Sequence, residues 1–364
     1  MKKEDYLRYS GSMQQIAYVR RIQYGEGRSK GMNALEVKNG PVRFTVMEDK
    51  ALDICELEYK GQQINFLSKP GLNGRNPFDT HGSEAQRSIM GGLFFTCGLE
   101  NICAPYTDPN GKEYPMHGRM RTTPAEHVCA DAAWRGDDYV MTISGEIREA
   151  ELFGENLVLH RTISTKLGEN AIYITDEVAN EAFRPEPMML MYHCNMGWPF
   201  LSEKSRLVLP TKKVTPRDEV SAAHANAWDV MDQPMDNAAE YVFLHELAAD
   251  TAGSTFAAVV DDERQLALVI EFSVVQFPYF MEWKSTASGD YVLGLEPSNS
   301  SVYGRPFHEK AGTLHIMTPQ TTEKKQLTFW ITEGHQAIKA LEHGCAALLK
   351  RQPDFLLPAV PMNE

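Results

Sequence analysis

Apolar and polar residues alternate in short runs along most of the chain. In the first clear run, Val42, Phe44 and Val46 alternate with polar residues, and a Glu-Asp-Lys turn then leads into a second apolar run. Alternation with a period of two predicts a β-strand that buries one face, and Gly, Asn or Asp between runs predicts tight turns. The same pattern recurs later in the chain, in residues 139–149, 157–180, 254–273, 313–319 and 326–334.

Strands this numerous predict an all-β protein, built as a large antiparallel β-sandwich of stacked sheets and not as a small barrel. Helices are expected to be few. One clear helical pattern spans residues 334–351, and we expect this C-terminal helix to pack on the edge of a sheet. Its apolar side chains fall on one face at spacings of about 3.6 residues: Ile338, Leu341, Cys345, Leu348 and Leu349. The length of 364 residues permits one large β domain or two ordinary ones.

Two long segments without alternation, residues 69–86 and 210–234, are expected to be loops. Long ordered loops on a β scaffold commonly carry binding residues. We therefore expect these two loops to wall a pocket.

Composition and charge limit the kinds of molecule that the protein is expected to bind. A hydrophobic content of 43% is enough for a substantial core. The formal charge of −13 argues against nucleic acid or an anionic membrane surface as a partner, since either needs clustered Lys and Arg. The N-terminal residues lack the apolar region of a secretory signal, and no run of about 18 apolar residues exists to span a bilayer. We therefore expect a cytoplasmic protein.

The distribution of cysteine and histidine argues against a metal centre. Six cysteines are scattered without a CxxC pair, as expected for reduced thiols in a cytosolic protein. There is no HExxH motif, and His245-Glu246 is not followed by a second histidine at helical spacing. Phosphate loops of the GxxxxGK type and GxSxG elbows are also missing, so nucleotide hydrolysis and serine-esterase chemistry have no support. We expect neither a metal nor a cofactor.

The most informative segment, residues 180–201, contains His193. This histidine lies in an apolar run, beside Asn195 and ahead of a Gly-Trp-Pro turn. An imidazole buried among apolar side chains needs a partner, and such surroundings move its pKa within the range around neutrality. The alternative is a core histidine that hydrogen-bonds to the backbone.

Two other segments carry candidate chemistry. A close turn contains His117, Gly118 and Arg121. The segment VLGLEP places Glu296 at the end of an apolar strand, before a polar loop, where a carboxylate is a candidate base. The alternative for Glu296 is a carboxylate that caps a loop or forms an ion pair.

In chain order, the motifs HGxxR, YHCNMGWPFL and LGLEPSNSSVYGR resemble those of the aldose 1-epimerase (galactose mutarotase) superfamily, and the resemblance spans most of the chain. The element GGxxxTCGL, from Gly91 to Leu99, is similar to its divergent, DUF4432-like branch. The resemblance implies a galactose mutarotase-like supersandwich that forms a single domain over residues 1–364. Within it, residues 1–40 would be an N-terminal extension and residues 334–351 the C-terminal helix.

The resemblance also implies roles for three residues. His117 would bind sugar, His193 would act as the acid and Glu296 as the base. The element Gly-Arg-x-x-Asn-Arg, which supplies a binding arginine in galactose-type members, has no clear counterpart here. The candidates to replace that arginine are Arg20, Arg21, Arg28 and Arg87.

Several further polar residues are candidate pocket residues. Arg121 would hydrogen-bond sugar hydroxyls, a carboxylate or a phosphate, or else brace a turn. Trp283 would stack on a sugar face or belong to the core. Asp53 would be a pocket wall or a buried turn anchor. Three asparagines complete the set: Asn101, Asn195 and Asn299.

These residues suit the interconversion of sugar anomers, which needs one base and one acid. We expect desolvation beside Trp283 and Tyr291 to raise the pKa of Glu296, and His193 to start protonated. The function we expect is therefore a cofactor-independent isomerase of the aldose 1-epimerase type, acting on a hexose, a modified hexose or a sugar acid.

The alternatives are a non-catalytic carbohydrate-binding protein or sensor and a lyase or hydrolase domain, although a typical glycoside hydrolase needs two carboxylates. The oligomeric state is left open.

Overall fold

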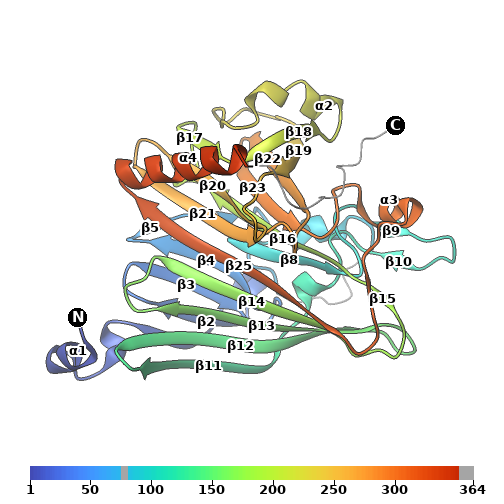
Figure 1. Ribbon diagram of the computed structural model, residues 1–364. Helices are drawn as coiled ribbons and strands as arrows, with labels where there is room; N and C mark the ends of the chain where they lie inside the picture. Colours follow the sequence, from blue (N-terminus) through green and yellow to red (C-terminus); the bar gives the residue numbers. More distant parts are fainter. Residues whose placement is uncertain (75–80, 352–364) are drawn as a thin grey trace.

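The structure is a computed structural model that describes residues 1–74 and 81–351, and three large antiparallel sheets dominate it (Figure 1). The largest sheet has eight strands in the order β11-β12-β13-β14-β25-β21-β20-β17. Along β12, every second residue is buried, because one face of this sheet packs on the core and the other meets solvent. The eight strands are β11 (Glu126–Arg135), β12 (Asp138–Ala150), β13 (Asn156–Lys166), β14 (Ala171–Asn180), β17 (Ser205–Val208), β20 (Ser254–Asp261), β21 (Leu266–Ser273) and β25 (Thr322–Glu333).

A five-stranded sheet follows the chain order from β1 to β5. Its first two strands fall within residues 1–40, which we expected to form an extension, and they pair with the rest of the sheet. The division of the chain into one domain plus an extension stays a prediction. The strands are β1 (Tyr18–Gln23), β2 (Asn33–Lys38), β3 (Val42–Met47), β4 (Asp53–Tyr59) and β5 (Gln62–Gln63).

The third sheet has six strands in the order β18-β19-β22-β23-β16-β8. Every residue of β16 is buried, as expected for an inner strand that is covered on both faces. The strands are β8 (Phe94–Leu99), β16 (Met189–Gly197), β18 (Thr211–Pro216), β19 (Glu240–Leu247), β22 (Tyr279–Ala287) and β23 (Asp290–Ser298).

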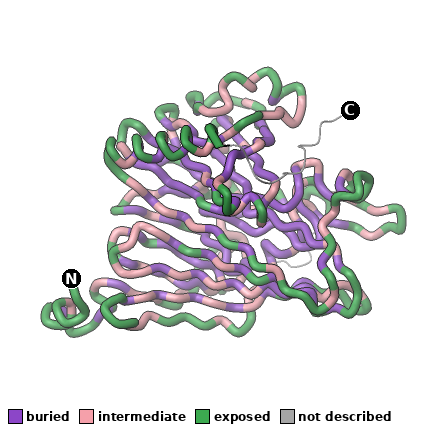
Figure 2. Tube along the Cα trace, in the orientation of Figure 1, coloured by how far each residue is buried: buried purple, intermediate pink, exposed green. Residues whose placement is uncertain are grey.

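The eight-stranded sheet forms one layer, and the other two sheets lie against it to enclose the main core (Figure 2). Phe94 of β8 stacks on Phe329 of β25, with ring centroids 5.7 Å apart. Phe272 of β21 stacks in the same way on Phe280 of β22, at 5.6 Å. These contacts join the six-stranded and eight-stranded sheets, and the predicted antiparallel β-sandwich is confirmed.

Helices are few among the described residues, as predicted. They are α1 (Lys3–Tyr9), α2 (Glu219–Ala222), α3 (Gly304–Ala311) and α4 (His335–Leu349). Helix α4 buries Ile338, Leu341 and Cys345 against the outer face of β17, β20 and β21. Leu349 is exposed, although we expected it on the packed face. None of the helices in residues 1–74 and 81–351 is long and apolar enough to cross a membrane.

The predicted loop over residues 210–234 is partly regular structure. Its first part is β18, which contains two lysines and a proline and lies at the edge of the six-stranded sheet. These residues suit an edge strand because they discourage pairing with a further strand. Short two-residue strands pair with one another in separate two-stranded sheets, β6 with β7, β9 with β10 and β15 with β24: β6 (Phe66–Leu67), β7 (Gly91–Gly92), β9 (Tyr106–Thr107), β10 (Glu113–Tyr114), β15 (Glu186–Pro187) and β24 (Ile316–Met317).

Candidate active site

A pocket of about 550 Å³ lies on the six-stranded sheet, on the face that points away from the eight-stranded sheet. Phe94 and Tyr192 point to the eight-stranded sheet, since Phe94 stacks there and the Tyr192 hydroxyl donates to Asp176 of β14. Side chains alternate along a strand, so the next residues, Phe95 and His193, face the pocket. The walls are Phe66, Ser68, Lys69, Pro70, Gln86, Ile89, Gly91, Phe95, Cys103, Ala104, Met116, His117, His193, Asn195, Arg217, Glu240, Val242, Trp283, Asp290, Glu296 and Val302.

His193 and Glu296 are cross-strand neighbours in this pocket. Strand β16 pairs with β23 so that Met191 lies opposite Ser298 and Cys194 opposite Leu295, and this register puts His193 opposite Glu296. The Nε2 atom of His193 lies 3.1 Å from Oε1 of Glu296. Two residues that are far apart in the sequence therefore form one acid–base pair, because the sheet pairs their strands.

Aromatic rings enclose His193. It stacks on Phe95 at a centroid distance of 4.5 Å and meets Trp283 edge-on at 5.2 Å and His117 at 5.6 Å. Burial among these rings lowers the pKa of His193 to about 4. His193 is therefore neutral near pH 7, and our expectation that it starts protonated is wrong, because desolvation outweighs the smaller opposing effect of its hydrogen bonding with Asn195.

The carboxyl group of Glu296 is buried beside this histidine. Burial raises the pKa of Glu296 to about 8, with a smaller effect from the negative charge of Glu240. Gly294 leaves the room for this carboxyl, since a Cβ there would lie 3.0 Å from Glu296 Oε1 and 3.1 Å from the Trp283 ring. Near pH 7 the pair thus holds one proton, on Glu296.

Three buried polar atoms in this part of the described chain have no hydrogen-bond partner: His193 Nδ1, Asn195 Oδ1 and Glu296 Oε1. The 3.1 Å contact between His193 and Glu296 is close, but it is not aligned as a hydrogen bond. An unsatisfied buried polar group costs about 1–3 kcal/mol, so a cluster of them in one pocket indicates a function.

His117 lies on a tight turn at the edge of the same pocket. The turn needs a glycine next, because a Cβ on Gly118 would lie only 2.2 Å from the carbonyl oxygen of Gly98. The backbone N–H of Cys103 donates to Nδ1 of His117 at 3.3 Å. Burial lowers the pKa of His117 well below its usual value. A neutral imidazole whose Nδ1 accepts a hydrogen bond carries its hydrogen on Nε2, so His117 can donate from Nε2.

Trp283 is held by a chain of polar contacts. Its Nε1 donates to Glu240 Oε2 at 2.8 Å, and the other oxygen of Glu240 accepts from Arg217 Nη2 at 3.1 Å. Arg217 Nε in turn donates to Asp218 at 2.8 Å. The sequence did not single out Arg217 or Glu240, although Arg217 falls in the segment 210–234 that we expected to wall a pocket.

The segment 69–86 also contributes to the walls, through Lys69, Pro70 and Gln86. Lys69 forms an ion pair with Asp290, which lies at the start of β23. Residues 75–80 of this expected loop lie outside the described residues.

Five of the predicted site residues line the pocket: His117, His193, Asn195, Trp283 and Glu296. Arg87 is exposed and lies 3.6 Å from Glu84. Arg121 is buried and donates from Nη1 to Ser88 at 2.9 Å, outside the pocket walls. Asn101 and Asn299 are buried, and their amides donate to backbone carbonyls.

Asp53 lies at the junction of the three sheets and not in the pocket walls. Its carboxylate accepts from the backbone N–H and hydroxyl of Thr96 at 3.0 and 2.6 Å and from Arg161 Nη1 at 2.8 Å. Arg161 also pairs with Asp176 at 2.6 Å. All four residues are fully or almost fully buried. Of the two roles we expected for Asp53, the structure favours the buried anchor.

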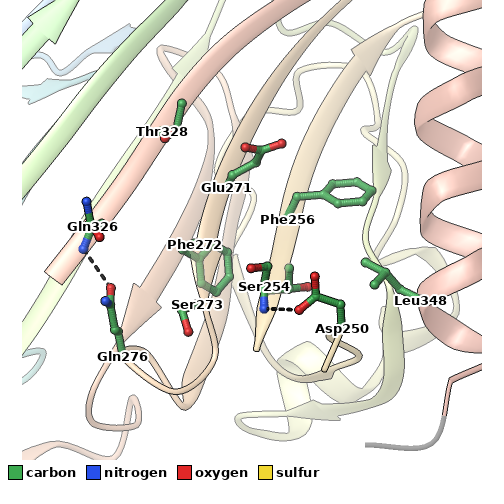
Figure 3. A pocket seen from close by; sticks show the side chains of 11 residues that line it. Asp250, Ser254, Phe256, Glu271, Phe272, Ser273, Gln276, Gln326, Thr328 and Leu348 are labelled. Carbon is green, nitrogen blue, oxygen red and sulfur yellow. Dashed lines mark hydrogen bonds between the residues drawn. The ribbon is translucent and has the colours of Figure 1, made fainter. Parts of the chain in front are cut away.

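A second hollow lies on the outer face of the eight-stranded sheet, beside α4 (Figure 3). Its polar groups serve the local backbone: Asp250 accepts from Ser254 N at 2.8 Å, and Gln276 accepts from Gln326 N at 2.8 Å. None of the described residues that line this hollow is a histidine, so it has no histidine–glutamate pair like that of the pocket. Within residues 1–74 and 81–351, no group of three or more His, Cys, Asp or Glu side chains is arranged to hold a metal ion.

Solved structures of other proteins share this fold. A candidate aldose 1-epimerase from Klebsiella pneumoniae is 23% identical and superposes with a TM-score of 0.85, covering 94% of this chain and 91% of that chain. A galactose mutarotase-like protein from Clostridium acetobutylicum is 14% identical, with a TM-score of 0.60 and coverage of 88% and 100%. Galactose 1-epimerase from Lactobacillus acidophilus is 12% identical, with a TM-score of 0.59 and the same coverage. The fold is therefore that of the galactose mutarotase-like proteins, as predicted.

The family itself is shown by the sequence match. The family model described as "Domain of unknown function (DUF4432)" matches residues 29–331, and the chain belongs to this family. None of the curated proteins compared with the chain matches it. The predicted DUF4432-like branch is thus confirmed, and the structural likeness carries the fold alone.

Proposed function

We propose that this protein is a cofactor-independent isomerase of the aldose 1-epimerase type, which interconverts the anomers of a sugar. One observation carries the proposal: Nε2 of His193 lies 3.1 Å from Oε1 of Glu296, inside a pocket and on one face of the sheet. An acid and a base at this separation can serve two neighbouring oxygen atoms of one small ligand. The pocket volume of about 550 Å³ lies within the range of small-molecule sites.

The reaction needs two proton transfers. A base removes the proton of the C1 hydroxyl, and an acid gives a proton to the ring oxygen. The C1–O5 bond then breaks, the C1–C2 bond rotates, and the reverse steps close the ring on the other face. Because the pair holds one proton in total, it supplies one acid and one base and returns to its starting state after each turnover.

The proton rests on Glu296, while the family resemblance assigns the acid to His193. The two descriptions are compatible, because one transfer across the 3.1 Å contact turns neutral Glu296 and neutral His193 into a carboxylate and an imidazolium. A sugar hydroxyl that donates to Oε1 of Glu296 stabilises the carboxylate and therefore favours this transfer. The carboxylate is then the base for O1, and the imidazolium is the acid for O5.

The surrounding side chains suit a sugar. The Nε2–H group of His117 can donate to a hydroxyl, and Oδ1 of Asn195 can accept from one. Trp283 presents an aromatic face of the kind that packs against the C–H groups of a pyranose. Together with Phe95, this ring keeps water from the acid–base pair, and low polarity strengthens each proton transfer.

The charges of the walls favour an uncharged substrate. Among the described lining residues, Lys69 is paired with Asp290, and Arg217 with Glu240 and Asp218. Neither cation is left to neutralise a phosphate or a carboxylate of a ligand. We therefore propose a neutral hexose or modified hexose, and not a sugar acid or a sugar phosphate.

Anomer exchange followed by NMR tests this proposal. The panel is glucose, galactose, mannose, glucuronate and glucose 6-phosphate, with wild-type protein, Glu296→Gln and His193→Asn. We expect acceleration of at least one neutral sugar, loss of that acceleration in both variants, and unchanged circular dichroism. If a sugar binds but no anomer exchange is accelerated, the protein is a carbohydrate-binding protein or sensor. Acceleration that survives in both variants would mean that other residues perform the chemistry.

A further inference from the structure

A second cavity of about 370 Å³ adjoins the active-site pocket. Phe66 lines both cavities, and Gly289 of the second cavity is followed directly by Asp290 of the pocket. The two cavities therefore meet at a ridge formed by Phe66 and the turn between β22 and β23. The second cavity is lined by Glu56, Gln63, Asn65, Phe66, Leu67, Trp198, Gly289 and Tyr291.

Trp198 is held beside this ridge by the fold. A Cβ on Gly197 would lie 2.8 Å from Cα of Phe66, so glycine allows β16 and Phe66 to approach closely. The next residue, Trp198, leaves 75% of its surface exposed. An exposed tryptophan at the end of an otherwise buried strand is not needed for the core. Because Trp198 also lines the second cavity, its ring is available to pack against a ligand there.

The other walls supply hydrogen-bonding groups but no positive charge. Tyr291 is half-buried, and its hydroxyl donates to the carbonyl oxygen of Asp232 at 2.7 Å, which fixes the ring. Glu56 is exposed, and Gln63 is partly exposed. A carboxylate and an amide can accept from and donate to hydroxyl groups. None of the described residues that line this cavity is Lys or Arg, so its chemistry fits a neutral, hydroxyl-rich ring and disfavours an anion.

We propose that the protein acts on neutral saccharides of at least two rings, such as disaccharides. The reducing-end ring lies at His193 and Glu296, and the second ring crosses the Phe66 ridge to stack on Trp198. This inference rests on the proposed function, because only the reducing-end ring has a free anomeric centre. It adds that the second ring contributes to substrate selection.

The test compares each monosaccharide with a disaccharide that has the same reducing end. The pairs are glucose with maltose, cellobiose and lactose, and galactose with galactobiose. Anomer exchange is measured by NMR for wild type, Trp198→Ala, Trp198→Phe and Phe153→Ala. Phe153 is a matched control, since it is an exposed aromatic residue (91%) on the β12–β13 hairpin.

The measured quantity is the ratio of kcat/KM for a disaccharide to kcat/KM for its monosaccharide. We expect the wild type to prefer at least one disaccharide and Trp198→Ala to lower the ratio about two- to tenfold, the size of effect expected for the loss of one ring contact. Trp198→Phe keeps a ring and should recover most of the ratio, and Phe153→Ala should not change it. A ratio near one in the wild type, or a ratio that Trp198→Ala leaves unchanged, would overturn the inference while the proposed function stands.

Calorimetric titration keeps the inference testable if no anomer exchange is found. Tighter binding of a disaccharide than of its monosaccharide, weakened by Trp198→Ala, would support the two-ring site even though the proposed enzymatic function had failed. Equal binding of both sugars, or binding of none of the disaccharides, would overturn it.

Discussion

The six-stranded sheet contains two histidine–glutamate pairs with the same separation and opposite surroundings. In one pair, Nε2 of His193 lies 3.1 Å from Oε1 of Glu296, and in the other, Nε2 of His245 lies 3.1 Å from Oε2 of Glu282. Each pair joins two adjacent strands. The first pair lines the pocket, whereas the second is fully buried on the other face, toward the eight-stranded sheet.

Hydrogen bonds account for three of the four polar side-chain atoms of the second pair, and the fourth, Oε1 of Glu282, has no hydrogen-bond partner in the described chain. His245 makes an aligned hydrogen bond to Glu282 through Nε2 and contacts Thr211 Oγ1 through Nδ1 at 3.1 Å. The Lys284 ammonium lies 4.0 Å from the other oxygen of Glu282. Lys284 also donates to three carbonyl groups of residues 227–230, which lie between β18 and β19. This pair therefore anchors a loop.

The comparison shows that residue types and distance do not define an active site. His193 Nδ1 and Glu296 Oε1 have no hydrogen-bond partner in the described chain, and they face a cavity. His245 has partners at both ring nitrogens, Glu282 Oε1 lies 4.0 Å from the Lys284 ammonium, and both residues of this pair face the core. An unpartnered polar atom that faces a cavity keeps its bonding capacity for a ligand, whereas one that faces the core, such as Oε1 of Glu282, cannot be reached by a ligand.

Matched glutamate variants test this difference most directly. Glu296→Gln removes the proton carrier of the pocket and should lower kcat/KM for anomer exchange by about 10²–10⁴-fold. Glu282→Gln should leave kcat/KM nearly unchanged, because Glu282 is buried away from the pocket. Both are measured by NMR on a sugar that the wild type accelerates. Equal losses in the two variants would mean that the buried pair also takes part in the reaction.

The free energy of unfolding of Glu296→Gln, compared with that of the wild type, should show how much the buried carboxyl group destabilises the folded protein. The folded pKa of about 8 lies above the unfolded value, so the folded state binds this proton more tightly. That contribution is complete below about pH 4.5 and is lost as pH rises through 8. Glutamine does not titrate, so the variant should be more stable than wild type by about 4 kcal/mol at pH 8, and the difference should disappear near pH 4.5. Urea unfolding at both pH values measures it.

A constant difference across this pH range would contradict the raised pKa. Phe153→Ala serves as the control, because it changes an exposed side chain that carries no ionisable group. Its stability difference from wild type should not vary with pH.

For Glu282→Gln we expect the opposite sign. Removing this carboxylate leaves the buried Lys284 ammonium without its counter-charge, which costs about 3 kcal/mol of the free energy of unfolding. Burial already lowers the pKa of Lys284, and Glu282 opposes that shift. Urea unfolding at pH 7 measures the loss. A variant as stable as wild type would mean that the carbonyl groups around Lys284 hold its charge without help from Glu282.

The fold could be predicted from the sequence because alternation is a local property. Residues 139–149 and 157–180 alternate in the sequence, and they form β12, β13 and β14 in the structure. The position of His193 in an inner strand followed from its apolar neighbours in the same way. The segment 210–234 was harder, since an edge strand such as β18 has lysines where an inner strand has apolar residues.

The candidate site could be predicted in part, and only through family resemblance. His193 and Glu296 meet because β16 pairs with β23, and no local pattern encodes that pairing. The role of Asp53 could not be predicted for the same reason. Its partner Arg161 lies on β13, so nothing near Asp53 in the sequence indicates that it belongs to a buried network. The protonation of His193 depends on rings from three other elements, which the sequence alone does not bring together.

The pH dependence of kcat/KM for anomer exchange is a smaller effect that also distinguishes the two histidine–glutamate pairs. The competent pair holds one proton, which requires a pH above the pKa of about 4 of His193 and below the pKa of about 8 of Glu296. After subtraction of the uncatalysed rate, kcat/KM should be flat between these values and fall about tenfold per pH unit outside them. Because the second pair faces the core, Glu282→Gln should not shift the two pH values at which kcat/KM begins to fall. If either pH at which kcat/KM begins to fall were shifted in Glu282→Gln, the two pairs would titrate together through the sheet. A fall in the wild-type kcat/KM that begins near pH 6.5 would show that His193 is not desolvated.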